Sequence, residues 1–320
     1  MEEKIDLIIP PDDRGTRLDV FIATHLRISR SLAARIIEQE LVMVDGISKR
    51  PSLRLKPGMR VAGTYEIVVK DETPTSKNIP LEIIYEDQWI IVINKPPGLA
   101  VHPGAGNKDN TLVNALLARY PEIAGVGEPS RPGIVHRLDK MTSGVMVAAR
   151  HTDAYSVLKD AFKAHEHLRE YLAIVYGHMP RLEGTIESFM QRNPRDRKKM
   201  TSRSGKGRKA ITRWKVAREW KGFSLLHLSL QTGRTHQIRV HLADMGYPIV
   251  GDLQYGGRKR ANSIKNPELK SFIRMLERQM LHACTLGIVH PIKNEYVEFK
   301  SEIPDDMSFL VKILDQADAA

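Results

Sequence analysis

The chain of 320 residues is poor in cysteine and has no long apolar run. Its single cysteine, Cys284, rules out an internal disulfide framework and favours a reducing compartment. The longest apolar stretches span only a few residues, as at Trp89–Ile93, which is far too short to cross a bilayer. The first residues also lack the apolar stretch of a signal peptide. We therefore expect a cytoplasmic protein that does not span a membrane.

The motifs of several large enzyme classes are missing as well. No Gly-x-Gly-x-x-Gly opens a helix after a strand, and no Gly-x-x-x-x-Gly-Lys-Ser/Thr loop occurs, so a nucleotide cofactor has no support. Twelve histidines are present, but none form a metal-binding His-x-x-x-His pair. His236 and His241 are five residues apart and do not share a helical face. We predict neither a metal nor a cofactor.

Positive charge is in excess, since 49 Lys and Arg residues face 38 Asp and Glu residues and give a formal net charge of +11. Such an excess favours an anionic polymer as partner, because binding releases counterions from its phosphates. One cluster occupies residues 195–209, which hold eight cations and one acid. Charge runs usually mark a solvated loop, but we interpret this one as an RNA-gripping insertion that orders on binding.

Residues 14–70 are predicted to form a small basic α/β module. We expect two short helices, the second capped by Ser29 or Ser31, and then a strand, the turn Asp45-Gly46 and another strand. Its cations are Arg27, Arg30, Arg35, Lys49, Arg50, Arg54 and Lys56. Their density predicts docking to an RNA backbone, and a basic cap that only packs on the main domain is the alternative. The polar, proline-containing residues 71–79 predict a flexible linker.

Residues 80–320 mix strands and helices without strict alternation. Strands are predicted at 81–85, 89–94, 145–149, 170–176, 211–218, 223–231, 281–289 and 295–300, and helices at 111–120, 153–166, 235–245 and 267–280. Asn266 is expected to cap the last helix. Several strands follow one another directly, which favours an α+β domain with a mixed, largely antiparallel sheet flanked by helices.

The segment His136-Arg137-Leu138-Asp139-Lys140-Met141-Thr142-Ser143-Gly144 contains a lone carboxylate between two cations. Apolar residues precede and follow it, so Asp139 is expected in a loop between buried stretches. Neighbouring cations favour the ionised form of an aspartate. An ionised, positioned carboxylate is either a structural counter-ion or a nucleophile, and this segment taken alone favours the counter-ion.

Residues 232–242 predict a loop followed by a helix that Thr235 caps and whose buried stripe includes Ile238. Arg234 and Arg239 would then lie near the helix N-terminus, where anions bind well. Arg239 could hold a carboxylate through two hydrogen bonds, which lysine does poorly.

Two further segments could contact a ligand. Alternation along the strand Arg169–Val175 buries Tyr171, whose ring could stack on a base and whose hydroxyl could handle a proton; a plain core tyrosine is the alternative. Residues 94–106, rich in proline and glycine, predict a rigid and accessible loop that begins at Lys95, although a plain surface loop is nearly as well supported.

Together these segments resemble the RluA/RluD family of pseudouridine synthases, most closely its large-ribosomal-subunit subgroup D. The resemblance rests on residues 136–144, on Tyr171 in its Arg-Glu-Tyr setting, and on Gly233-Arg234-Thr235-His236-Gln237-Ile238-Arg239-Val240-His241. Asn94-Lys95-Pro96-x-Gly98, Val101-His102-Pro103-Gly104-Ala105-Gly106 and Gly251-Asp252-x-x-Tyr255-Gly256-Gly257 add to it. Met141 departs from the acidic residue that this family often has there, and we expect it to alter only loop packing.

The basic module resembles the small RNA-binding domain named after ribosomal protein S-four. The matching residues are Arg17-Leu18-Asp19, Ser29-Arg30-Ser31 and Val42-x-Val44-Asp45-Gly46. With it, the resemblance covers nearly the whole chain.

The resemblance implies an isomerase that flips specific uridines out of RNA and converts them to pseudouridine without a cofactor. Its implied partner is 23S ribosomal RNA, free or in the pre-50S particle, with transfer RNA or another ribosomal site as the runner-up. Asp139 would be the nucleophile, Tyr171 the stacking and acid–base group, and Arg239 the partner of Asp139. We expect a monomer.

The resemblance also implies a set of substrate-binding residues. These are Arg137, His136, Ile238, Arg234 and Lys95. Ile238 would line the uracil pocket, and Arg137 would fill the place in the RNA stack that the flipped uridine leaves.

Two other functions stay open on the sequence. A non-catalytic RNA-binding assembly factor could have the same fold, although pure binding has no need of a lone carboxylate. A hydrolase of glycosidic bonds generally uses two carboxylates, and the sequence indicates no partner acid near these motifs.

Overall fold

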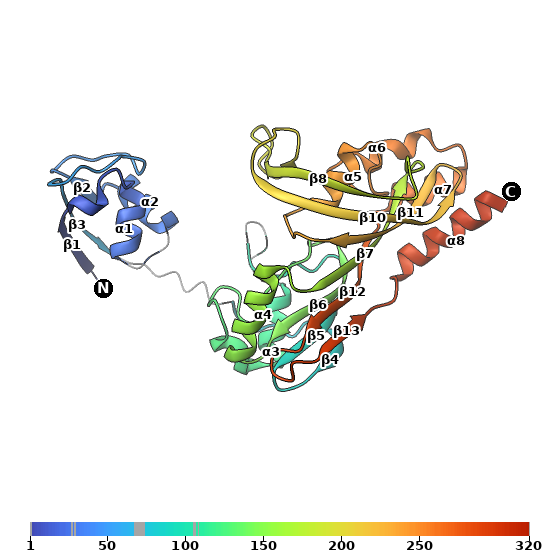
Figure 1. Cartoon of the computed structure of the whole chain (residues 1–320), viewed down its shortest axis with the longest axis horizontal. Coiled ribbons are helices and arrows are strands. Elements are labelled where there is room, and N and C mark those ends of the chain that lie inside the picture. The colour runs from blue at the N-terminus through green and yellow to red at the C-terminus, as the bar shows by residue number, and fades with distance from the viewer. Residues whose placement is uncertain are drawn as a thin grey trace. The chain divides into compact units, whose positions relative to one another are not determined.

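The computed structural model describes residues 2–26, 28, 30–66, 74–104, 107 and 109–319. It divides the chain into two compact units, Met1–Glu72 and Thr73–Ala320. Figure 1 shows both units with their elements labelled. No helix in the described part of the chain is both long and apolar enough to cross a membrane.

The N-terminal unit is a three-stranded antiparallel sheet with two helices. The sheet has the order β1-β3-β2, with β1 at Glu2–Ile8, β2 at Val42–Val44 and β3 at Arg60–Glu66, and α1 and α2 span Leu18–His25 and Arg30–Glu38. Strand β1 precedes residue 14, where the sequence predicted the module to start. The predicted turn is confirmed, because Asp45 and Gly46 both have positive φ angles, of 52° and 74°, as a type I′ turn after β2 requires.

Asp19 joins the beginnings of both helices in this unit. Its carboxylate, 3% exposed, accepts hydrogen bonds from Arg17 and Arg30 at 2.8 and 3.0 Å. Hydrogen bonds from Arg17 and then Arg30 lower the pKa of Asp19 to about 2, against the opposing effect of burial. The predicted cap Ser29, the cation Arg27 and the side chain of Ser31 lie outside the described residues.

The predicted linker is bound to the C-terminal unit over much of its length. Residues 71–73 lie outside the described residues. Beyond them, the Asn114 side-chain amide donates to the Thr75 carbonyl at 2.6 Å, and the Lys77 amide donates to the Asn114 carbonyl at 2.9 Å. Residues 74–79 therefore do not form the flexible connection that their polarity predicted.

The C-terminal unit contains a ten-stranded sheet, most of whose strands are labelled in Figure 1. Its strands are β4 (Glu82–Glu86), β5 (Ile90–Lys95), β6 (Ser143–Ala149), β7 (Leu168–Tyr176), β8 (Glu183–Arg192), β9 (Met200–Thr201), β10 (Arg208–Trp220), β11 (Phe223–Leu230), β12 (Leu281–Val289) and β13 (Tyr296–Lys300). The order is β4-β5-β6-β12-β7-β11-β10-β8-β9, and β13 pairs with β12. Only β6 and β12 pair in parallel, which confirms the predicted α+β class with a largely antiparallel sheet.

Helices pack along this sheet. They are α3 (Leu112–Arg119), α4 (Thr152–Ala164), α5 (Gln237–Asp244), α6 (Gly257–Arg260), α7 (Pro267–Met275) and α8 (Asp305–Ala319). In Figure 1, α3 and α4 lie beside the part with β4, β5 and β6, whereas α5, α6 and α7 lie beside the part with β8 and β10. The sequence predicted neither α8 nor the strands β8 and β9.

Two helix ends differ from the prediction. Asn266 caps α7 as predicted, but the helix ends at Met275 and not at residue 280. The reason is that the Met280 backbone is hydrogen-bonded elsewhere, donating to the Val250 carbonyl and accepting from the Ile174 amide of β7. Thr235 does not cap α5, because the N-cap is His236 in a left-handed conformation with φ 56°.

Residues 195–209 form part of the sheet and its hairpin. Met200 and Thr201 pair with β8, and the last two residues, Arg208 and Lys209, begin β10. Arg203 forms an ion pair with Asp244 of α5 at 2.7 Å. This segment is therefore folded in the free chain, and the prediction that it orders only on binding was wrong.

A buried histidine of α5 makes the stability of the C-terminal unit dependent on pH. His241 is 1% exposed, with its ring nitrogens 2.9 Å from the Thr212 hydroxyl and 2.8 Å from the Ser188 hydroxyl. Burial lowers its pKa to about 4, below the ordinary 6.5, so the unfolded chain binds a proton in this interval that the folded chain excludes. His241 should therefore contribute a loss of roughly 3 kcal/mol in unfolding free energy as the pH drops from 6.5 to 4, and no loss above pH 6.5.

Urea unfolding followed by tryptophan fluorescence measures this dependence, since Trp89, Trp214 and Trp220 all lie in the C-terminal unit. His241→Gln should flatten the loss of stability between pH 6.5 and 4.5. The matched change at the half-buried His227 should keep the slope of the unmodified chain. Equal slopes for His241→Gln and the unmodified chain would contradict this role.

Candidate active site

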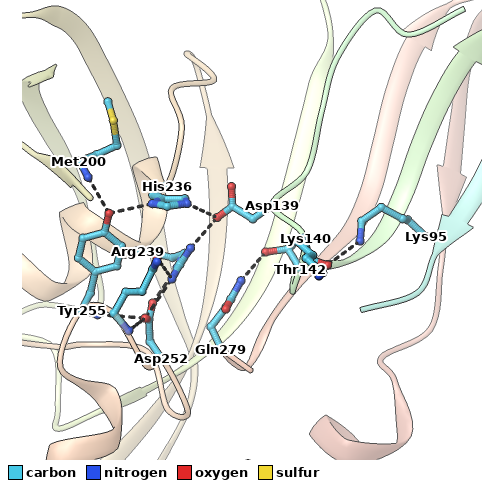
Figure 2. Close-up of polar contacts among 11 residues, drawn as sticks. Lys95, Asp139, Lys140, Thr142, Met200, His236, Arg239, Asp252, Tyr255 and Gln279 are labelled. Atoms are coloured by element: carbon cyan, nitrogen blue, oxygen red, sulfur yellow. Dashed lines mark hydrogen bonds and ion pairs between the residues drawn. The ribbon is translucent and has the colours of Figure 1, made fainter. Parts of the chain in front are cut away.

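Asp139 lies in the loop before β6 and contacts α5. Its Oδ2 accepts a hydrogen bond from Arg239 Nη1 at 3.0 Å and lies 3.9 Å from His236 Nε2 (Figure 2). The Asp139 side chain is 17% exposed, whereas that of Arg239 is 7% exposed. The contact predicted between Asp139 and Arg239 is therefore present, with the carboxylate still reachable from solvent.

Contacts on both sides hold the Asp139 loop in place. The Thr142 amide donates to the Asp139 carbonyl at 3.1 Å, and the Thr142 hydroxyl accepts from Gln279 at 3.0 Å (Figure 2). Gly144, with φ 120°, runs so close to β12 that a Cβ atom there would lie 2.1 Å from the Ala283 carbonyl oxygen. Only glycine fits this close approach, which fixes where the loop joins the sheet.

Lys95 lies beneath the same loop. Its Nζ donates to the carbonyls of Pro96, Leu99 and Lys140 at 2.8, 3.0 and 3.2 Å, and the residue has no exposed surface. Burial lowers the pKa of Lys95 to about 7, and in the protonated form the three acceptors use all three donors of the ammonium group. The structure therefore corrects the prediction that Lys95 binds substrate, since it supports the Asp139 loop from inside.

Replacing Lys95 with methionine should loosen this support. Three buried carbonyls would lose their donor, so we expect a loss of about 3 kcal/mol in unfolding free energy and a fall of about 8 °C in Tm. The activity should fall about tenfold or more because Asp139 is less well positioned. Calorimetry and the kcat/KM measure the two effects, with the exposed Lys215→Met as control. Lost activity at unchanged stability would instead favour a direct substrate contact.

Arg239 connects two carboxylates. Its Nε and Nη2 donate to Asp252 at 2.8 and 3.1 Å, its Nη2 also donates to Gln254 at 2.9 Å, and its Nη1 reaches Asp139. The guanidinium also lies 5.0 Å from the centre of the Tyr255 ring. Burial alone would lower the pKa of Arg239, but Asp252 first and Asp139 next raise it, so the group stays cationic.

Asp252 is a second acid close to the site, where the sequence indicated none. It is 1% exposed, and its oxygens accept from Arg239 and from the Gln254 and Tyr255 amides. Its hydrogen-bonding capacity is thus taken up by the protein, which makes it a counter-ion of Arg239. The only sequence signal was its place in the quoted motif Gly251-Asp252-x-x-Tyr255, to which no role was given.

His236 is a further residue that the sequence analysis left without a role. Its Nδ1 is 2.8 Å from the Tyr255 hydroxyl, which accepts from the Met200 amide at 2.9 Å (Figure 2). A phenol that accepts from Met200 has its own proton free for Nδ1, which leaves the Nε2 proton toward Asp139. Burial lowers the pKa of His236, so the ring is neutral near pH 7.

Tyr171 lies on the buried face of β7 with Ala173 and Val175, as alternation predicted. The residue is 5% exposed, and burial raises the pKa of its phenol, which therefore stays protonated at neutral pH. Together with Asp139 and Ile238 it lines a small cleft of about 60 Å³ that opens to solvent.

Most of the predicted site residues meet in this active-site cleft. Its lining includes Arg137, Asp139, Tyr171, Arg234, Ile238 and Arg239. His136 does not line it. Its ring stacks on Phe162 with centroids 4.4 Å apart, and its Nε2 accepts from the Val147 amide at 3.0 Å.

The cleft joins a carboxylate, a neutral phenol and apolar walls in one place. A planar ring can lie between the apolar side chains with one edge toward Asp139, and cations stand ready for an anionic group attached to that ring. In the part of the chain that the structure describes, no three His, Cys, Asp or Glu side chains gather to hold a metal ion.

Comparison with known proteins places these features in a family. Residues 89–244 match the family model of RNA pseudouridylate synthase, and residues 16–61 match that of the S4 domain. The chain is 41% identical to ribosomal large subunit pseudouridine synthase D of Xanthomonas campestris, over 98% of the chain and 94% of that protein. It is 44% identical to the protein of the same name in Zymomonas mobilis, with 94% of each covered. For the Escherichia coli K12 protein of that name, the identity is 39% over 98% of the chain and 96% of the relative.

A solved structure agrees in fold. The chain resembles human RNA pseudouridylate synthase domain containing 1 with a TM-score of 0.54 and 26% identity. This similarity covers 74% of the chain and 95% of the human protein.

Proposed function

The chain belongs to the RNA pseudouridylate synthase family, and from this we propose that it isomerises specific uridines of large-subunit ribosomal RNA to pseudouridine with Asp139 as its covalent catalyst. The activity follows from the family. The choice of large-subunit RNA is supported by relatives that are named for it along nearly their whole length. The observation that carries the role of Asp139 is its contact with the buried Arg239 in a cleft that Tyr171 also lines.

The reaction itself sets what the residues must do. The bond between the sugar and the uracil nitrogen breaks, the uracil turns, and the sugar joins ring carbon 5. The proton on carbon 5 leaves, and the released nitrogen gains one. No electrons enter or leave and no group arrives from elsewhere, so acid–base groups and one nucleophile can complete the change.

Asp139 supplies the nucleophile in our proposal. Arg239 orients its carboxylate, because the guanidinium is held by Asp252 and cannot turn away. The carboxylate can attack the sugar, attack the uracil ring or assist formation of a glycal. The three routes share the same requirement, which is an anion close to the unstacked nucleotide.

Tyr171 and Ile238 hold the uracil. The Tyr171 ring offers a face for stacking, and its protonated hydroxyl can take part in proton transfer at the ring. Ile238, 4% exposed, gives the pocket an apolar wall. These contacts suit a planar, uncharged base.

Contacts of basic residues with the RNA offset the free energy needed to flip the uridine out of the stack. Extruding a base costs a few kcal/mol. Arg137 is exposed beside the cleft and can fill the place left in the stack, while Arg234 and residues 195–209 can bind the backbone.

Mapping pseudouridines in RNA from cells with and without this gene tests the proposal. Specific pseudouridines of 23S ribosomal RNA should disappear on deletion and return with the unmodified gene, but not with an Asp139→Asn gene. Loss confined to transfer RNA would overturn the proposed substrate. Free uracil or abasic sites would identify a hydrolase, and full rescue of growth and ribosome assembly by Asp139→Asn would indicate an assembly factor.

A further inference from the structure

Arg169, at the start of β7, is a buried cation without a counter-ion. It is 8% exposed, and its Nε is buried without a hydrogen-bond partner. Within the described part of the chain the structure gives its guanidinium neither a hydrogen bond nor an ion pair. A buried charge is costly unless it is paired, so this position is unfavourable for folding alone.

The guanidinium lies where two cavities meet. Arg169 lines the active-site cleft and also a second cavity of about 430 Å³, open to solvent, which we call the basic cavity. Arg137, Gly233 and Arg234 line both cavities as well. The two spaces thus share one wall, and Arg169 is buried within it.

The basic cavity is suited to an anion. Its lining contains Arg131, Arg137, Lys163, Arg169 and Arg234 but no Asp or Glu. His102 and His136 add two buried Nδ1 atoms that have no hydrogen-bond partner. Several donors without acceptors, gathered in one hollow, point to a ligand that brings the acceptors.

Arg169 also lies close to Tyr171, the residue proposed to stack on the flipped uracil. It is two residues before Tyr171 on the same strand and on the same buried face, so the two Cα atoms are about 7 Å apart. Gly233 holds the guanidinium close, because a Cβ atom on Gly233 would lie 2.6 Å from Arg169 Nη1. A nucleotide whose base meets Tyr171 would bring one of its flanking phosphates to this wall.

We propose that Arg169 binds a backbone phosphate next to the target uridine, at the wall shared by the active-site cleft and the basic cavity. This rests on the proposed function, since it assumes that a uridine of RNA enters the cleft. The planar guanidinium can hold two phosphate oxygens at once. Phosphate binding supplies the counter-ion that the described part of the free protein lacks. The unfavourable free energy of the buried, unpaired Arg169 is thereby relieved when RNA binds, which strengthens binding.

Neutral phosphate substitutions in a synthetic RNA test the contact. The probe is an RNA hairpin with one uridine that the purified protein modifies, in which each phosphate within two nucleotides of that uridine is replaced in turn by a methylphosphonate. For the unmodified protein, kcat/KM should fall about 10- to 100-fold at one linkage and much less at the others. The kcat/KM of Arg169→Met should be lower by a similar factor on the normal RNA. Placing the methylphosphonate at that linkage should not lower the kcat/KM of this variant any further.

Arg131→Met is the matched control. Arg131 lines the same basic cavity, but its guanidinium is already paired with Glu128 at 2.7 Å. The fold-change in kcat/KM caused by Arg131→Met and the fold-change caused by the methylphosphonate should multiply, because the two act independently. Arg169→Lys keeps the charge without the fork, so it should retain sensitivity to the methylphosphonate and provides a second test if the methionine variant fails to fold.

The Tm of Arg169→Met gives an independent test, because a purely structural role of Arg169 predicts a fall in Tm. Removing an unpaired buried charge should leave the Tm of Arg169→Met unchanged or raise it by a few degrees. A marked fall in Tm would show that the guanidinium has a partner in the free protein and would overturn the proposal. The proposal would also be overturned if, at every linkage, the losses in kcat/KM caused by Arg169→Met and by the methylphosphonate multiplied.

The outcomes that would overturn the Arg169 contact differ from those that would overturn the proposed function. If the unmodified protein forms no pseudouridine in any RNA, the proposed function is wrong. Affinity of the Asp139→Asn protein for the same set of RNA hairpins still reports the Arg169 contact, because that measurement needs no turnover.

Discussion

Replacing Asp139 with asparagine is expected to lower pseudouridine formation at least about 1,000-fold while RNA affinity stays within about twofold. Asparagine has nearly the same shape and can still accept the hydrogen bond from Arg239 that now measures 3.0 Å. It cannot act as an anionic nucleophile. Asp252 remains as the counter-ion of Arg239, so the fold of the site should survive.

Single-turnover assays on an RNA that the unmodified protein modifies would measure the first effect, and filter binding the second. Asp315→Asn is the matched control, because Asp315 also binds an arginine, Arg218, at 2.5 Å but does not line the cleft. It should keep full activity. Undiminished turnover by Asp139→Asn would remove the basis for a nucleophilic carboxylate.

Patterns of polarity predicted most of the C-terminal unit because most of its strands bury an apolar face. The strand at 170–176 and the helix at 111–120 were placed within two residues, since the periodicity of apolar residues is a local signal. Strand β8 was missed because its residues alternate between exposed and half-buried, without a buried apolar face until Met190. The cap of α5 was missed because His236 adopts a left-handed backbone that the tight turn after Arg234 imposes.

The candidate site was predictable only in part. Asp139, Tyr171 and Arg239 come from segments far apart in the chain, and nothing in the spacing alone brings them together; the resemblance to a known family did so. Lys95 was misread because a basic residue in an open loop looks like a ligand contact, whereas three nearby carbonyls draw it inward. Asp252 and Arg169 were overlooked because whether a buried charge has a partner is a property of the folded chain.

Replacing Arg239 with methionine should damage both stability and activity. Asp252, 1% exposed, would lose the cation that binds both of its oxygens, and breaking a buried ion pair from one side costs about 3 to 5 kcal/mol. For a unit of this size we expect a fall of about 10 °C in Tm. Asp139 would also lose its orienting partner, so pseudouridine formation should drop at least about 100-fold.

A second substitution separates the two effects. Adding Asp252→Asn to Arg239→Met removes the unpaired buried charge and should restore much of the lost Tm. The oxygen of the introduced side-chain amide can still accept the hydrogen bonds from the Gln254 and Tyr255 backbone amides that Asp252 Oδ1 accepts now. Activity should not return, because Asp139 remains without its guanidinium. If the double variant regained activity along with stability, Arg239 would act only by keeping the site folded, and its pairing with Asp139 would have no part in the chemistry.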